Sequence, residues 1–505
     1  MKSEIIVLSV ALISFFVVSL VFARPKSRLH SSGLFGSKKA KALIVIVTSI
    51  TILCCTVPMN LAPKWNGEVP EHRDQYEKIT ESFLNGHLYF EYDVDEALEA
   101  LDNPYSPEER IQNGVDFHWD HAYYNGHYYM YFGVVPVILA FLPFRLVTGV
   151  SLTTYHATQL FAALFIVGVF LLFYQLAKKF FPNLSLSVYL YLSVAFSVMS
   201  IWYAIAAPAL YCTAIVSGLA MMIWGIYFWA KAVWGSEKRS SSIIYSTIGS
   251  LFGALTFGCR PTVALGNVIV LGMIVYYFKN KSHFKRKWID VLVFISPYII
   301  VGVLLAAYNY ARFDSFLEFG QHYQLTGSDI NNLPGLFDQS SFLSKIKLLL
   351  RYALNFVKYL FKTAEIRDFA STGTVLTFPI ILYALFAREN DQSRKLIKEK
   401  RIRLLVFLMV LTPFIILAAD VMGSPDVLPR YRMDTNWIFG LLTFVSICLV
   451  YETKQNKRNF SSFICYCSVV TVIVCVLLFL CPYDSNFTMH YYGAIKEAIV
   501  NVIKR

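Results

Sequence analysis

Charged side chains are scarce in this sequence: they make up 15% of its 505 residues, whereas hydrophobic residues make up 56%. A soluble protein of this length exposes more polar surface than such a composition supplies. Apolar runs of about 20 residues, the length that crosses a bilayer, recur along the whole chain. The scarcity of charge therefore excludes a water-soluble globular fold and predicts an all-α polytopic membrane protein.

Cysteine is absent from the one large polar segment, residues 62–132, and no internal repeat is visible in the chain. All nine cysteines lie in or beside apolar runs, at Cys54, Cys55, Cys212, Cys259, Cys448, Cys465, Cys467, Cys475 and Cys481. This placement indicates neither a disulfide framework nor a thiolate metal site. It is typical of small, buried hydrophobic side chains.

The chain carries a net charge of +12, and its lysine and arginine residues concentrate in short linkers between apolar runs. These linkers lie at residues 24–41, 238–239, 279–287, 394–403 and 454–458. Basic linkers mark the cytoplasmic side of a membrane protein. The charge is therefore explained without a nucleic-acid partner, and the polar segments between these linkers are expected outside the cytoplasm.

The apolar runs predict about 11–13 transmembrane helices and divide the chain into six regions. They are two N-terminal transmembrane helices with a basic cytoplasmic linker (1–61), an extracytoplasmic acidic and aromatic loop (62–132), a transmembrane bundle (133–308), an extracytoplasmic loop (309–373), C-terminal transmembrane helices (374–481) and an extracytoplasmic tail (482–505). Within the second loop, residues 341–363 mix basic and aromatic side chains, which suits an amphipathic helix lying on the membrane surface.

Strict alternation of the spans fails once. If segments 134–149 and 157–177 both cross the membrane, the basic linkers at Lys238 and Lys279 fall on the outer side. Either one segment is re-entrant or a span between residues 130 and 180 is miscounted. Pro136 and Pro143 make 134–149 the suspect, because proline interrupts helix hydrogen bonding.

The first outer loop is rich in acids, and Asp74 is the first candidate for chemistry among them. Tyr76, Ile79 and Phe83 follow Asp74 at helical spacing, so it is expected at the start of an amphipathic helix near the membrane. A carboxylate there is placed to take a proton from an attacking hydroxyl. The competing interpretation is an acid that only favours the positive end of a helix dipole.

The end of the same loop gathers acids, imidazoles and aromatic rings just before a membrane segment. The candidate residues are Asp116 and Asp120 for catalysis and His118, Trp119, His121 and Tyr128 for substrate binding. Aromatic faces beside carboxylates are suited to sugars, although interfacial aromatic belts have the same composition. The two histidines lack a defined third ligand, so no metal site is assigned and a divalent cation is left open as a cofactor.

Arginines recur at positions that the topology places near the outer membrane surface. The candidates for binding a phosphate are Arg260, Arg312, Arg351, Arg430 and Arg432. An arginine at a membrane interface is costly, and its guanidinium fork suits phosphate, whereas snorkelling or ion pairing is the competing explanation. Beside Arg312, the residues Glu318, His322 and Tyr323 add a polar cluster of candidate substrate-binding side chains.

These stretches together resemble the bacterial branch of the GT-C superfamily of membrane glycosyltransferases, the dolichyl-phosphate-mannose and glycosyltransferase family 39-like proteins. The resemblance is carried by HRDQYEKITESFLNGHLYF, WDHAYYNGHYYMYFGVVPVILAFLPFRLVTG, FGCRPT, YNYARFDSFLEFGQHYQLT and LPRYRMD, which extend from about residue 60 to residue 436. It implies a GT-C-like bundle with a large first outer loop, in which Asp74 corresponds to the essential loop acid and outer basic residues hold the carrier phosphate.

The chain departs from that family pattern in two places. It has an extra N-terminal span before the loop, and its first loop has no pair of adjacent acids near Asp74, where Glu71 and Glu77 are the nearest. The second departure leaves open whether Asp74 acts alone or with Asp116 or Asp120.

The leading hypothesis is an inverting glycosyl transfer at the outer face of a bacterial plasma membrane. A polyprenyl-phosphate-linked sugar is the expected donor, Asp74 the general base, and a cell-envelope glycan, lipid or protein the acceptor. The expected partners are therefore the lipid-linked donor, the extracytoplasmic acceptor and membrane lipids. Two alternatives stay open: a glycan polymerase or ligase that uses a polyprenyl-diphosphate donor, and a lipid or glycan transporter (flippase).

Overall fold

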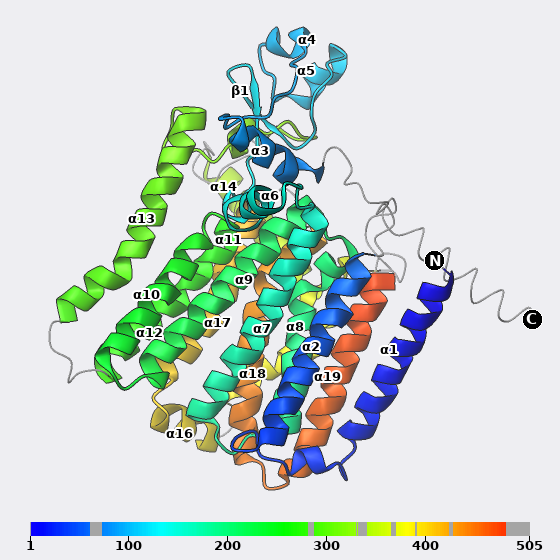
Figure 1. Ribbon diagram of the computed structural model, residues 1–505, viewed down its shortest axis with the longest axis vertical. Helices are drawn as coiled ribbons and strands as arrows, with labels where there is room; N and C mark the ends of the chain where they lie inside the picture. The colour runs from blue at the N-terminus through cyan, green and yellow to red at the C-terminus, as the bar shows by residue number, and fades with distance from the viewer. Residues whose placement is uncertain are drawn as a thin grey trace, which may run out of the picture.

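A computed structural model describes residues 2–60, 73–280, 287–329, 331, 341–364, 370–388, 391–423 and 428–480. Long helices form a bundle with their axes running between its two ends (Figure 1). They are α1 (Lys2–Ala23), α2 (Lys38–Met59), α7 (Thr154–Phe180), α8 (Leu186–Ala206), α9 (Leu210–Ala230), α10 (Arg239–Leu255), α12 (Val268–Asn280), α13 (Lys287–Phe313), α17 (Arg403–Gly423), α18 (Arg432–Thr453) and α19 (Lys457–Leu480).

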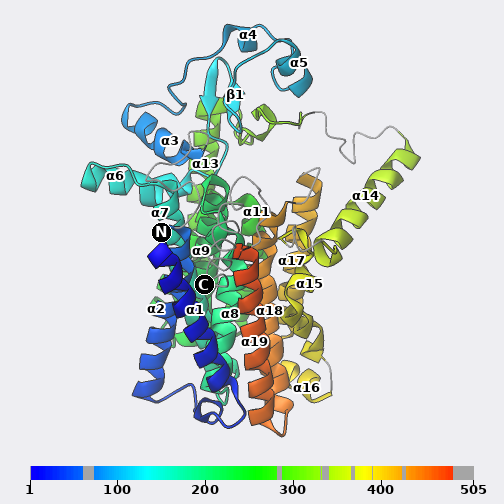
Figure 2. The same cartoon turned by 90° about the vertical axis from the view of Figure 1, so that its right-hand side faces the viewer.

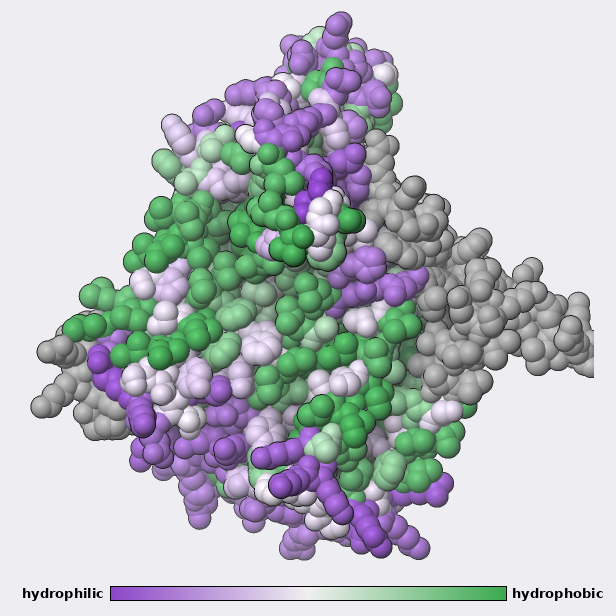
Figure 3. Space-filling model, in the orientation of Figure 1, coloured by the Kyte–Doolittle hydropathy of each residue, from purple (hydrophilic) through white to green (hydrophobic). Residues whose placement is uncertain are grey.

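Nine helical segments within the described ranges are long and apolar enough to cross a membrane. Helices α1 and α10 lie beside them, α1 against α19 and α10 between α9 and α13. Together they agree with the lower end of the predicted range. On the face seen in Figure 3, hydrophobic surface extends across the middle of the molecule, with hydrophilic surface above and below it. The chain is thus a multi-pass membrane protein with an all-α bundle.

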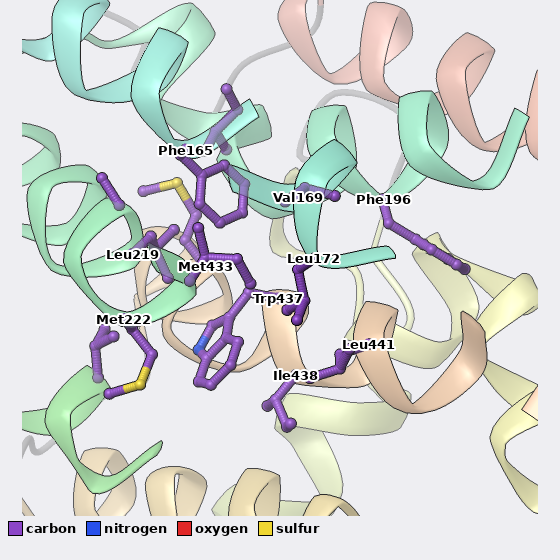
Figure 4. Packing of buried hydrophobic residues seen from close by; sticks show 14 of the residues in the cluster. Phe165, Val169, Leu172, Phe196, Leu219, Met222, Met433, Trp437, Ile438 and Leu441 are labelled. Carbon is purple, nitrogen blue, oxygen red and sulfur yellow. The ribbon is translucent and has the colours of Figure 1, made fainter. Parts of the chain in front are cut away.

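Helix α18 forms the centre of this bundle, and the window of it that qualifies as a span is entirely buried. Trp437 of α18 points among side chains of α7 and α9, including Leu219 and Met222 (Figure 4). Small residues let the neighbours approach: a Cβ on Gly266 would lie 2.7 Å from the Trp437 ring. Close contacts at glycine are how membrane helices pack without a hydrophobic driving force between them.

The suspect segment 134–149 does not form a spanning helix. It consists of a π-helical turn, η3 (Val137–Phe141), and the short helix α6 (Leu142–Thr148). These twelve residues are too few to cross a bilayer, and α6 lies across the upper end of the bundle (Figure 2). With this segment removed from the count, successive long helices alternate in direction from α1 to α13 and from α17 to α19, and the chain returns between α13 and α17 through residues 374–388. The basic linkers then fall at the lower end, where α16 (Asp391–Glu399) also lies (Figure 1).

The polar segments 73–132 and 314–329 form one unit above the bundle, which we call the cap. Its elements are α3 (Gln75–Leu84), α4 (Glu96–Glu99), α5 (Pro107–Gln112), the hairpin strands β1 (Ala122–Tyr124) and β2 (His127–Tyr129), and the 3-10 turn η6 (Gln321–Tyr323). The two segments are joined by backbone hydrogen bonds, from Asp120 N to Leu325 O (3.0 Å) and from Leu325 N to His121 O (2.9 Å). The two segments of the cap are therefore joined into one unit that covers the end of the bundle.

The amphipathic helix expected over 341–363 is observed as α14 (Phe342–Phe361). It leans away from the bundle, with its C-terminal end against α17 (Figure 2). The hydroxyl of Tyr359 donates to the carbonyl of Tyr431 (3.1 Å) and shares a hydrogen bond with Thr435 (2.6 Å). One end of α14 is thus fixed to α18, and its position on a membrane surface stays a prediction.

The remaining short elements connect the long ones. They are η1 (Arg28–His30), η4 (Lys231–Gly235), α11 (Pro261–Ala264), η5 (Leu265–Asn267), α15 (Thr374–Thr377), η9 (Pro379–Arg388) and η10 (Pro429–Tyr431). The described cysteines form no disulfide. The predicted tail 482–505, Cys481 and the start of the first loop at 62–72 lie outside the described residues.

Candidate active site

A cavity of about 350 Å³ lies where the cap meets the upper end of the bundle. Its volume is in the range of pockets for small ligands. Cap residues 131–134 and 319–328 form part of its wall, and the ends of α9, α10 and α13 with residues 428–431 form the rest. Apolar side chains form part of the wall, among them Phe132, Val134, Ile215, Phe257 and Leu305.

Asp120 is the carboxylate that lines this cavity. Its backbone has a φ of +58°, a left-handed conformation that aspartate adopts more readily than most residues. The residue is 8% exposed, and its carbonyl oxygen accepts from Gln75 Nε2 at 2.9 Å. Backbone contacts with both segments of the cap therefore fix the position of this acid.

Two tyrosines orient the Asp120 carboxylate. Tyr131, at the end of the cap segment, donates to Oδ1 at 3.5 Å, and Tyr211, in the first turn of α9, donates to Oδ2. Burial raises the pKa of the Asp120 carboxyl, and the nearby charge of Arg430 and the hydrogen bond from Tyr131 offset part of that rise. The carboxylate is therefore an oriented, poorly solvated base.

Arg430 is the arginine of the cavity that is best placed to bind an anion. Its guanidinium lies over the ring of Tyr211 at 4.1 Å and over the ring of Tyr431 at 5.3 Å, and it lines the cavity. Among the described residues it donates no hydrogen bond. Its donors therefore remain available, within that part of the chain, for an anion bound in the cavity.

Arg260 enters the same cavity but is paired. Its Nη2 lies 2.8 Å and its Nε 3.2 Å from Oδ2 of Asp434 on α18, and Thr262 also donates to that oxygen at 3.2 Å. A second buried acid, Asp420 on α17, interacts electrostatically with both. Arg260 is therefore held rigidly at the wall, with its charge largely balanced by acids from two helices.

Arg312 also lines the cavity, and its hydrogen bonds hold two parts of the wall together. It is 5% exposed, donates to Met130 O at 2.6 Å and to Asn309 Oδ1 at 2.9 Å, and lies 3.8 Å over the Tyr308 ring. These contacts join the end of α13 to the cap. Arg312 thus adds positive charge near the cavity while most of its donors are used.

The two other predicted phosphate ligands lie elsewhere. Arg432 is buried and donates to Thr372 O and Thr377 Oγ1, which ties α18 to residues 370–377. Arg351 lies on the exposed side of α14. Neither side chain lines the cavity. The predicted set of five arginines is therefore divided by the fold into three at the cavity and two away from it.

Asp74 and Asp116 do not line the cavity. Asp74 precedes α3, and its carbonyl oxygen accepts from Lys78 N at 3.0 Å, so it stands at the helix start that the sequence predicts. Its neighbour Gln75 contacts Asp120. Asp116 is exposed in the upper part of the cap, where its backbone N–H donates to Asp95 at 2.8 Å. The catalytic role assigned to Asp74 from the sequence stays a prediction.

The predicted substrate-binding residues His118, His121 and Tyr128 form the aromatic core of the cap. The His118 ring lies 4.2 Å from Tyr92 and 4.9 Å from Tyr128, and His121 is 1% exposed. These rings pack the hairpin rather than line the cavity. Within the described ranges, no group of three or more His, Cys, Asp or Glu side chains is arranged to hold a metal ion.

Glu318, His322 and Tyr323 stand on the outer side of segment 314–329. Glu318 accepts from His322 Nδ1 and from Gly320 N, both at 2.6 Å, and Tyr323 packs on Tyr124 at 4.6 Å. The neighbouring side chains line the cavity instead, namely Phe319, Gln321, Gln324, Thr326 and Ser328.

From the sequence, no functional role was assigned to Tyr131, Tyr211 and Gln321, which line the cavity, or to Asp434, which pairs with Arg260 at its wall. The sequence does contain a signal for Asp434, because this acid follows two candidate arginines in LPRYRMD and lies at the start of a predicted membrane span. Tyr211 offers no such signal, because it is one of 32 tyrosines in an aromatic-rich chain. Only the fold brings it to Asp120.

No protein-family model and no curated protein matches the chain. The solved structures similar to it include ArnT from Cupriavidus metallidurans bound to undecaprenyl phosphate, with 10% identity, a TM-score of 0.41, and coverage of 81% of this chain and 60% of that one. They also include the oligosaccharyltransferase AglB from Archaeoglobus fulgidus in complex with an inhibitory peptide and a dolichol-phosphate, with 14% identity, a TM-score of 0.44, and coverage of 87% and 56%.

The apo form of the oligosaccharyltransferase from A. fulgidus is similar too, with 12% identity, a TM-score of 0.42, and coverage of 86% of this chain and 55% of that one. The chain thus spans little more than half the length of these proteins.

Proposed function

We propose that this protein is a membrane glycosyltransferase that moves a sugar from a polyprenyl-phosphate carrier to an acceptor hydroxyl at the outer face of a bacterial plasma membrane. One observation carries the proposal: Asp120, a buried and oriented carboxylate, lines the same cavity as Arg430, whose donors are available within the described chain. A base beside an anion-binding cation is what transfer from a glycosyl phosphate requires.

The reaction follows from this arrangement. The acceptor oxygen attacks the anomeric carbon of the donor, and Asp120 takes the proton that this oxygen loses. The bond between the anomeric carbon and the phosphate oxygen breaks, and its electron pair leaves with the phosphate. Arg430 stabilises the charge that develops on that oxygen. Attack opposite the leaving group inverts the anomeric centre, and the products are a glycoside and a polyprenyl phosphate.

The apolar wall suits the lipid part of such a donor. Phe132, Phe257 and Leu305 line the same cavity as the arginines, and Phe257 is 42% exposed, which supports an entrance for a lipid beside Phe257. No residue of the amphipathic helix α14 lines the cavity, so we place the lipid tail past Phe257 rather than beside that helix.

Two acids compete for the role of general base. Asp120 lines the cavity, whereas Asp74 does not, and its neighbour Gln75 donates to the Asp120 carbonyl oxygen. We therefore assign proton transfer to Asp120 and keep Asp74 as the alternative that the family resemblance implies. Comparison of the two Asn variants separates them.

The position of the cavity also bears on the other candidate functions. It lies at the cap end of the bundle, opposite the basic linkers, which supports an extracytoplasmic site. Transporters bind their cargo near the middle of the membrane, between related halves. A diphosphate-linked donor would use the same arginines, so this alternative is distinguished by the donor that the protein accepts.

The test uses membranes that contain the protein at normal levels and polyprenyl-phosphate hexoses and pentoses labelled in the sugar. We expect Asp120→Asn to lower the transfer of label from the carrier by at least about 100-fold, the usual contribution of a general base. Asp116→Asn, a cap acid outside the cavity, is the matched control and keeps the wild-type rate. Wild-type transfer by Asp120→Asn, with loss in Asp74→Asn, would show that the base is Asp74.

A further inference from the structure

Trp119 occupies an unusual position next to the proposed base. It precedes Asp120 in the chain, yet its side chain is 46% exposed while Asp120 is 8% exposed. Tryptophan is costly to expose and carries a broad apolar face with one polar edge. An exposed tryptophan beside a buried cavity acid therefore calls for a ligand that covers part of its ring.

The contacts of Trp119 place its ring at the rim of the cavity. A Cβ added to Gly327 would lie 3.3 Å from Cη2 of the indole, so the ring rests against the backbone of the second cap segment where no side chain intervenes. The residues on either side of Gly327, Thr326 and Ser328, both line the cavity. The ring is therefore continuous with the cavity wall on its outer side.

The rim next to this ring is polar but uncharged. Gln321, Gln324, Thr326 and Ser328 line the cavity there and carry amide or hydroxyl groups. The Thr326 hydroxyl already donates to Ser328 O at 2.9 Å, so the two glutamines and Ser328 are the side chains that the inference uses. Such groups both donate and accept hydrogen bonds, as sugar hydroxyls do. An apolar ring face together with amides and hydroxyls fits the two faces of a carbohydrate, whose C–H groups stack and whose hydroxyls form hydrogen bonds.

The charge of the cap limits further which class of ligand can bind at this rim. Its two segments hold sixteen Asp and Glu residues and three Lys and Arg residues, so the approach to the rim is strongly acidic. Like charges repel at the approach to a binding site. A phosphorylated or carboxylated acceptor is therefore disfavoured, and a neutral one is favoured.

We propose that Trp119 and the amide rim beside it form an acceptor subsite for a neutral carbohydrate, which stacks on the indole and turns one hydroxyl toward Asp120. This inference rests on the proposed glycosyl transfer, because it names the class of acceptor for that reaction. Trp119 would contact the acceptor with its ring face. Its side chain also forms a hydrogen bond with Asp120, which lowers the pKa of that acid, but Trp119 does not itself carry the proton.

The test measures binding rather than transfer. Purified protein is mixed with maltotetraose, cellotetraose or mannotetraose, and binding is followed by saturation-transfer NMR. We expect at least one of these to bind, and Trp119→Ala to weaken it by about tenfold or more through loss of the stacking face. Trp119→Phe keeps a ring and is expected to retain most of the affinity. Phe316→Ala removes another exposed aromatic ring of the cap, 59% exposed, and serves as the control.

The outcomes separate this inference from the proposed function. Binding of none of these sugars, equal binding by Trp119→Ala, or preference for an anionic sugar or a peptide over the neutral sugars each overturns the acceptor subsite. Asp120→Asn should still bind the sugar while it loses transfer. If glycosyl transfer depends on Asp120 but the affinity for the sugar is the same with and without Trp119, the proposed enzyme activity stands and only the acceptor subsite is wrong. Thermal unfolding of each variant confirms that it is folded.

Discussion

Asp120 owes its role to side chains that approach it from distant parts of the chain. Tyr131 comes from the same cap segment, Tyr211 from the first turn of α9, and Arg430 from η10, just before α18. The sequence marked Asp120 as a candidate through its aromatic and acidic neighbours. It could not rank Asp120 above Asp74 or Asp116, because the contacts that orient and desolvate one of them are all tertiary.

Removal of the Tyr211 hydroxyl should change how activity depends on pH. A base is active when deprotonated, so transfer falls as the pH is lowered through the pKa of Asp120, which burial raises above its ordinary value. The Tyr211 hydroxyl stabilises the ionised carboxylate, so Tyr211→Phe raises that pKa further. We expect the acidic limb of kcat/KM to move to higher pH.

The control for this experiment is Tyr310→Phe, because Tyr310 is 50% exposed and does not line the cavity. Its pH profile should match that of the wild type. An unshifted acidic limb in a folded Tyr211→Phe variant would mean that the titrating group is not Asp120.

For the arginines, too, the sequence identified candidate residues but could not predict their tertiary contacts. All five were recognised as costly cations near one membrane surface. The fold assigns Arg260 to an ion pair with Asp434, Arg312 and Arg432 to backbone carbonyls, and leaves Arg430 beside the acid. A pattern of residue types gives the cations but not their partners, because the partners lie on other helices.

At the scale of elements, apolar run length predicted the long helices well, since a membrane span is a local property of the chain. The prolines in 134–149 correctly identified the segment that does not span. The cavity is formed, however, by the ends of these elements and the turns beside them. One contact among these turns is unusually close. Gly133, where the cap meets η3, lies against the turn that follows α10.

Substitution of Gly133 should separate these two walls of the cavity. A Cβ at this position would lie 2.3 Å from Gly258 O and 2.4 Å from Cys259 O, and Val135 N donates to the same Gly258 oxygen at 2.9 Å. Overpacking of this kind costs about 1–3 kcal/mol. We expect Gly133→Ala to lower both the Tm of the purified protein and its rate of transfer.

The matched substitution is Gly302→Ala on α13, where an added Cβ meets nothing within 4 Å. It should leave the Tm unchanged or raise it slightly, because alanine favours a helix more than glycine does. Equal behaviour of the two alanine variants would contradict the close packing of the walls at Gly133.

At the scale of the whole molecule, charge is separated between the two ends. The basic linkers lie at one end with α16, and the acidic cap with its cavity lies at the other (Figure 1). The surface at both ends is hydrophilic on the face seen in Figure 3. The sequence predicted this separation from the positive-inside pattern alone, because it needs only the order of spans. It could not predict the cavity, whose wall comes from two cap segments and the ends of several helices.

The central claim is that this cavity holds the phosphate of a polyprenyl carrier through Arg430. Its most direct test is the binding of a radiolabelled polyprenyl phosphate to purified wild-type protein, Arg430→Gln and Arg351→Gln. We predict that Arg430→Gln weakens binding by about 10- to 100-fold, the worth of one or two hydrogen bonds to a charged group. Arg351→Gln, on α14 outside the cavity, should bind as the wild type does. Unchanged binding by a folded Arg430→Gln variant would contradict the account.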